Sequence, residues 1–160
     1  MIAQDLKDFV VVPTLKDISE FIPFSESAVN LLLGTAAQES QFNYLDQLGS
    51  GPGPAYGLFQ MERTTHDSHK AWLKQKPKFY EFVQTYQIMF LDDCTELHGN
   101  LYYATILARI HYWRVAASLP AASDVLRMAH YWKQHYNTFE GSGTVSQFVA
   151  NYQRLVTPLR

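Results

Sequence analysis

A single glutamate, Glu39, ends an otherwise uncharged segment, AVNLLLGTAAQ, over residues 28–38. If this segment is a buried helix, the carboxylate lies where unpaired helix carbonyls carry partial negative charge. That charge and the nearby apolar side chains of Leu33 and Phe42 disfavour the ionised form and raise the pKa of the carboxyl. A glutamic acid that keeps its proton near neutral pH can serve as a general acid. The alternative is an exposed carboxylate at a helix end, where water screens the effect.

A second group of polar residues includes the residue types that bind metals, but not in the order of a known metal-binding motif. Glu62, His66 and His69 occur at helical spacing, but they do not form the HExxH pattern. Asp67, which lies between the histidines, is better explained as the partner of Thr64 in a capping box. We therefore expect no metal and no cofactor. The other histidines are predicted to be core or groove residues: His98, His111, His130 and His135.

The elements that must position Glu39 are predicted to be mainly helical. Thr14 is expected to cap a short helix that ends before Pro23, and Ser25 to open the helix that carries Glu39. The run GSGPGPAYG over residues 49–57 requires turns, so residues 44–61 are predicted to form a loop or a small hairpin. Further helices are expected to begin near these residues: Thr64, Pro77, Asn100, Ser123 and Thr144. The helix from Asn100 is predicted to be long and buried, over residues 100–118.

Composition favours one folded domain over residues 1–160. The chain has 160 residues, and 47% of them are apolar, which is enough for a core. Lys and Arg are scattered and the net charge is -2, so nucleic acid is not an expected partner. We expect no signal peptide and no membrane insertion, because no apolar run reaches the length that either requires. The single cysteine, Cys94, has no partner in the chain for a disulfide.

Several short motifs resemble, in order, those of the lytic transglycosylase catalytic domain. They are ESQF at 39–42, GLFQM at 57–61, the Asn-led helix NLYYATIL at 100–107, YN at 136–137 with Gly141 and Gly143 after it, and Tyr152 in the last helix. The family's usual glycine is absent at Ala104. This SLT-like domain belongs to the lysozyme-like superfamily, and the resemblance covers about residues 25–156. It implies a mainly α, lysozyme-like fold with a saccharide cleft.

The resemblance implies a reaction on peptidoglycan. Glu39 would protonate the β-1,4 glycosidic oxygen between N-acetylmuramic acid and N-acetylglucosamine, and would then act as the base. In the family, the C6 hydroxyl of the muramic sugar closes a 1,6-anhydro ring without water. One carboxylate then suffices, whereas hydrolytic glycosidases generally use two.

The same resemblance implies the residues that bind the glycan. Ser40, Gln60 and Tyr136 are expected beside the acid, with the Tyr136 hydroxyl contacting Glu39. Ser40 can instead cap the helix end, Gln60 can brace the loop, and Tyr136 can be purely structural. Gly57 is expected to let the backbone approach the sugar. The remaining groove residues are expected to be Tyr56, Leu58, Phe59 and Asn137.

Two other functions share some of these features. A hydrolytic, goose-type lysozyme would use the same acid with a second carboxylate, for which Asp46 and Glu62 are available. A non-catalytic module that binds the cell wall is the other alternative. The chain is similar to phage-encoded muralytic enzymes, or endolysins. We therefore expect a monomer that reaches the periplasmic cell wall through a holin pore, on a virion tail or with a secretion system.

Overall fold

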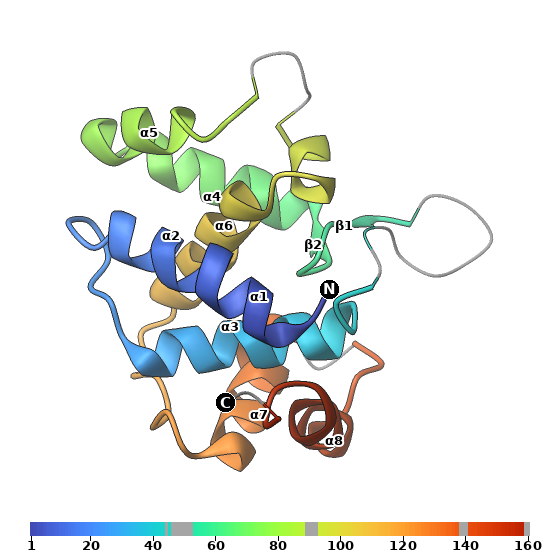
Figure 1. Cartoon of the computed structure of the whole chain (residues 1–160). Coiled ribbons are helices and arrows are strands. Elements are labelled where there is room, and N and C mark those ends of the chain that lie inside the picture. Colours follow the sequence, from blue (N-terminus) through green and yellow to red (C-terminus); the bar gives the residue numbers. More distant parts are fainter. Residues whose placement is uncertain (44, 46–52, 89–92, 138–140, 159–160) are drawn as a thin grey trace.

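The computed structural model describes residues 1–43, 45, 53–88, 93–137 and 141–158, which form helices and one two-stranded hairpin (Figure 1). The predicted mainly helical class is confirmed. Helix α3 (Glu26–Glu39) crosses the middle of the molecule. It packs against α1 on one side, α7 and α8 on the other, and α6. The helix that carries Glu39 is therefore the central one.

Local sequence signals explain α3. The Ser25 hydroxyl accepts the Ala28 N–H at 3.0 Å, so Ser25 is the predicted N-cap. Every residue from Leu31 to Ala37 is buried. Thr35 is the polar exception, and its hydroxyl donates to the Leu31 carbonyl at 2.8 Å. A helix covered on nearly all sides is expected to be apolar around its whole circumference, as this one is.

The N-terminal helix is longer than predicted. Helix α1 (Ala3–Leu6), a π-helical turn η1 (Lys7–Val11) and α2 (Val12–Asp17) follow one another without a break. The expectation that Thr14 caps a helix is wrong, because Thr14 lies inside α2 and is buried. Pro13 has no N–H to give the Phe9 carbonyl, and that carbonyl instead accepts the Tyr102 hydroxyl at 3.3 Å. This contact ties the N-terminal helix to α6.

The predicted hairpin is present. Strands β1 (Ala55–Tyr56) and β2 (Met61–Glu62) pair antiparallel, with Tyr56 opposite Met61. Helix α4 (Arg63–Lys74) follows directly, so the Thr64–Asp67 capping box is wrong. Asp67 instead bonds the Nδ1 atom of His66 at 2.8 Å. Helix α5 (Pro77–Gln84) begins at its proline, as expected.

The C-terminal half builds the other side of α3. A 3-10 turn η2 (Thr95–His98) precedes α6 (Leu101–Trp113), which is capped by Asn100 and ends before the predicted residue 118. Helix α7 (Val125–Trp132) is capped by Asp124 rather than by Ser123 and continues into a π-helical turn η3 (Lys133–Asn137). Thr144 opens α8 (Val145–Leu155) with a complete capping box.

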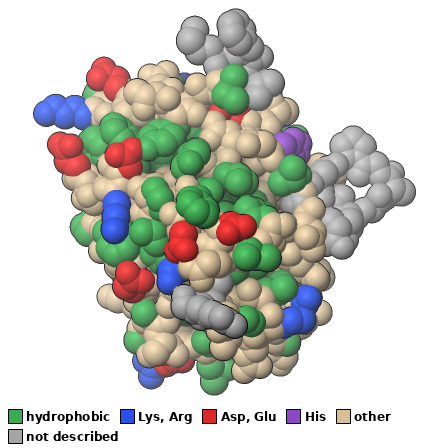
Figure 2. All heavy atoms as spheres, viewed as in Figure 1, with side chains coloured by type: hydrophobic (Ala, Val, Ile, Leu, Met, Phe, Trp, Pro, Cys, Tyr) green, Lys and Arg blue, Asp and Glu red, His purple; other side chains and the backbone are tan. Residues whose placement is uncertain are grey.

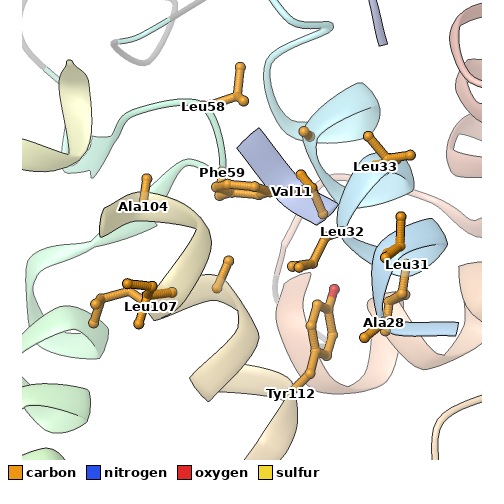
Figure 3. Packing of buried hydrophobic residues seen from close by; sticks show 14 of the residues in the cluster. Val11, Ala28, Leu31, Leu32, Leu33, Leu58, Phe59, Ala104, Leu107 and Tyr112 are labelled. Carbon is orange, nitrogen blue, oxygen red and sulfur yellow. The ribbon is translucent and has the colours of Figure 1, made fainter. Parts of the chain in front are cut away.

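One core joins the helices to the turn after β1. Leu58 and Phe59 point into the same cluster as Val11 and Leu32, and Tyr112 reaches toward α3 (Figure 3). Outside the core, acidic, basic and apolar side chains are interspersed over the face seen in Figure 2. Among the described residues, no helix combines the length and apolar character needed to cross a bilayer.

Candidate acid site at the end of the central helix

Glu39 is the last residue of α3 and is partly buried. Its Oε1 atom accepts a hydrogen bond of 2.8 Å from the indole Nε1 of Trp132. Trp132 is the last residue of α7 and is fully buried. The site therefore forms where the C-terminal ends of two helices meet, in a place that restricts access of water to the carboxyl.

Burial is the main cause of the raised pKa at this site. It raises the pKa of Glu39 from 4.5 to about 7, and the hydrogen bond from Trp132 lowers the pKa in part. The direction matches the expectation from the sequence, with desolvation as the larger cause. At neutral pH a large fraction of the carboxyl groups keep their proton. That is the state that a general acid needs.

Two tyrosines lie close enough to sense the charge of Glu39. Burial, and then that charge, raise the pKa values of Tyr112 and Tyr136 well above their ordinary value. Their ring centroids are 5.4 Å apart, and the Tyr112 hydroxyl shares a hydrogen bond of 2.7 Å with Thr35 on α3. Both phenols therefore remain neutral, and hydrogen bonds to Thr35 and to the Phe59 carbonyl hold their hydroxyls in place.

The expected hydrogen bond between Tyr136 and Glu39 is not formed. The Tyr136 hydroxyl donates to the Phe59 carbonyl at 2.8 Å instead. This carbonyl belongs to the turn between β1 and β2 and is not part of the strand pairing, so it can accept a hydrogen bond from a side chain. Tyr136 thus joins η3 to the turn, and its influence on Glu39 is electrostatic.

Ser40 and Gln60 are both engaged within the protein. Ser40 is fully buried, and its hydroxyl donates to the Ala36 carbonyl at 3.1 Å, which matches the alternative of a helix-end role. The Gln60 side-chain amide donates to the Gly57 carbonyl at 2.8 Å, which matches loop bracing. Gln60 is still partly exposed, whereas the Ser40 hydroxyl is closed off from any ligand in this conformation.

Gly57 serves packing rather than approach to a ligand. Its φ is +73°, and a Cβ atom there would lie 1.8 Å from the Leu97 carbonyl oxygen. Only glycine permits both this conformation and this contact. The neighbouring Leu58 and Phe59 side chains are each 1% exposed and pack in the core (Figure 3). Their side chains therefore do not line an open groove.

The remaining predicted groove residues lie at the surface. Tyr56 is partly exposed, with its ring centroid 5.0 Å from that of His98 and the Arg63 guanidinium 5.5 Å from its centre. Asn137 is also partly exposed, and its Oδ1 accepts from Lys133 Nζ at 2.7 Å. These two side chains have surface available to a ligand.

Trp132 is the site residue that the sequence did not assign to Glu39. It lies in the segment that was expected to form a helix from Ser123, and nothing in that segment indicates which group its indole contacts. A buried indole, however, usually finds an acceptor for its N–H. Glu39, at the end of another buried helix, was a candidate acceptor. Only the packing of α7 against α3 brings the Trp132 N–H and the Glu39 carboxyl together.

The two histidines weighed as part of a metal site are hydrogen-bonded to other groups. His66 Nε2 pairs with the Tyr103 hydroxyl at 2.9 Å, and His69 Nε2 with His111 Nδ1 at 3.1 Å. No cluster of three or more metal-ligating side chains occurs in the described part of the chain. Of the two carboxylates considered for a hydrolase, Glu62 is exposed, and Asp46 lies outside the described residues.

No family model, curated protein or solved structure matches this chain. The likeness to lytic transglycosylases therefore rests on the ordered motifs. The geometry around Glu39 is a separate observation, because it depends on burial and on contacts that the motifs do not include.

Proposed function

We propose that the chain is a peptidoglycan lytic transglycosylase with a lysozyme-like fold. The observation that carries this proposal is a single carboxyl, Glu39, at the end of the central helix with its pKa raised to about 7. The order of the motifs over residues 25–156 supplies the reaction class. The substrate is the β-1,4 bond between N-acetylmuramic acid and N-acetylglucosamine.

The proposed reaction uses Glu39 twice. First, its proton passes to the bridging oxygen as the bond from C1 of the muramic sugar breaks and the electron pair leaves with that oxygen. Next, the C6 hydroxyl oxygen bonds to C1, and its proton returns to the Glu39 carboxylate. No water is consumed, and the carboxyl ends as it began. A pKa of about 7 suits an acid that must also act as a base.

The residues proposed to act on the glycan fall into two groups, those that are partly exposed and those that are buried. Tyr56, Gln60 and Asn137 are partly exposed, so we assign them to direct contact with the sugars. Tyr136 supports the turn through the Phe59 carbonyl. The buried residues act from beneath the site and hold its shape: Ser40, Leu58 and Phe59. The glycan strand of the bacterial cell wall is the proposed partner, reached by holin release, virion delivery or a secretion system.

The test uses purified peptidoglycan sacculi and two proteins, the wild type and Glu39→Gln. The wild type is expected to release soluble muropeptides, and the variant to be slower by about 10²–10⁴-fold, as for loss of a general acid. Mass spectrometry should find 1,6-anhydro ends, which are lighter than reducing ends by one water.

Each other outcome rejects a defined part of the proposal. Reducing ends would mean a hydrolase on the same acid. Equal release of muropeptides by both proteins would mean that Glu39 takes no part in the reaction. Binding to sacculi without release would mean a non-catalytic module.

A further inference from the structure

The indole of Trp132 is held rigidly beside Glu39. It is fully buried, and its ring packs against Phe148 of α8 at a centroid distance of 5.4 Å. On another side is Gly143, where a Cβ atom would lie 2.6 Å from the indole Cη2. A ring enclosed in this way cannot easily change rotamer. Its N–H therefore points at Glu39 Oε1 in a fixed direction.

This hydrogen bond distinguishes the two oxygens of the carboxyl. An indole N–H can only donate, so the oxygen that it contacts must accept. In the protonated acid only one oxygen carries hydrogen, and the other, the carbonyl oxygen, is the stronger hydrogen-bond acceptor. The indole N–H at Oε1 therefore favours the form in which Oε1 is the carbonyl oxygen. The proton therefore belongs on Oε2, the oxygen that Trp132 does not contact.

We propose that Trp132 is a positioning residue for the acid, which keeps Oε1 as an acceptor and so presents the transferable proton on Oε2. This inference rests on the proposed function for the identity of the proton acceptor, the glycosidic oxygen. The assignment of the proton to Oε2 does not depend on it. After transfer, the same N–H remains bonded to the carboxylate and stabilises its charge until the proton returns.

A second consequence concerns acidity. A donor to a carboxylate favours the ionised form, so Trp132 holds the pKa of Glu39 lower than burial alone would set it. In the part of the chain that the structure describes, the other titratable groups whose pKa responds to the charge of Glu39 are Tyr112 of α6 and Tyr136 of η3. Both are neutral near pH 7, so neither can replace the effect of the indole.

The test is a titration of the Glu39 carboxyl by ¹³C NMR, with glutamate labelled at Cδ and the signal assigned through Glu39→Gln. In Trp132→Phe the pKa is expected to rise by about one pH unit above the wild-type value of about 7. Phe148→Leu is the matched control, since it loosens the same packing but keeps the N–H, and its titration should follow the wild type. If Trp132→Phe does not fold, benzothienylalanine at position 132 replaces the N–H by sulfur with little change of shape.

Activity on sacculi gives the second measurement. In Trp132→Phe, kcat should fall about tenfold or more at pH 6 with little change in KM, and the alkaline limb of the rate profile should move upward with the pKa. The proposal is overturned if the titration and the rate profile of Trp132→Phe coincide with the wild type, or if Phe148→Leu moves them as much. A wild type inactive on sacculi would reject the proposed function, while the NMR titration would still decide the role of Trp132.

Discussion

Replacing Glu39 by glutamine should make the protein more stable at neutral and alkaline pH. The folded state holds the Glu39 proton with a pKa of about 7, against 4.5 for an unperturbed carboxyl. Between these two values the folded state binds more protons than the unfolded state, so the free energy of unfolding falls as pH rises. At about 1.4 kcal/mol per pH unit, the full loss above pH 7 is about 3 kcal/mol. Glutamine has no charge to bury and keeps an oxygen for the Trp132 N–H.

The assay is urea unfolding of the wild type and Glu39→Gln, followed by circular dichroism from pH 4 to pH 8.5. The difference in unfolding free energy should be near zero at pH 4 and approach about 3 kcal/mol in favour of the variant at pH 8.5. In thermal unfolding at pH 8.5 this corresponds to roughly 6–12 °C in Tm. Glu20→Gln, at an exposed position, is the control and should show no such trend.

The reasoning would be refuted by parallel stability curves for Glu39→Gln and the wild type across this range. Such a result would mean that the carboxyl is as well solvated in the folded state as in the unfolded state. The comparison needs no substrate. It therefore tests the electrostatics of the site separately from the chemistry proposed for it.

Two further predictions concern the residues around the site. Gly57→Ala should destabilise the protein by at least about 2 kcal/mol, because residue 57 has a left-handed backbone conformation and the new Cβ would clash with the Leu97 carbonyl. The loss would be measured as a lower midpoint of urea unfolding. Gly99→Ala is the control with open space around its Cβ and should have a much smaller effect; equal losses for the two variants would contradict the argument. Burial, His111 and Arg114 lower the pKa of His69 to about 3. Below pH 6.5 the unfolded state therefore binds more protons than the folded state, so the free energy of unfolding should decrease as the pH is lowered, by up to about 1.4 kcal/mol per pH unit. His69→Gln should show a shallower slope in urea unfolding from pH 6.5 to pH 4, and an unchanged slope would contradict it.

Elements with a local cause were predictable from the sequence. Ser25 caps α3 through its own hydroxyl, Pro77 starts α5, and Thr144 opens α8 in a capping box with Gln147. Each of these signals acts within one turn of the chain. The raised pKa of Glu39 was also predictable in direction, because an apolar segment before a carboxylate implies burial.

Contacts between distant segments were not predictable in the same way. The hydroxyl of Tyr136 goes to the Phe59 carbonyl, 77 positions away along the chain, and the Trp132 indole goes to Glu39, 93 positions away. Gly57 looked like a site of close approach, and it is one, but its neighbour is the Leu97 carbonyl rather than a sugar. Residue types and spacing indicate that such groups need partners. Only the packing of helices decides which partners they obtain.

The pH dependence of glycan cleavage tests most directly whether Glu39 works as a protonated acid. The initial rate of muropeptide release from purified sacculi by the wild type would be followed from pH 4.5 to pH 9. We predict that the rate falls above about pH 7, approaching a tenfold loss per pH unit as the carboxyl ionises. A rate that stays level or rises from pH 6 to pH 9 would contradict the assignment of Glu39 as the acid.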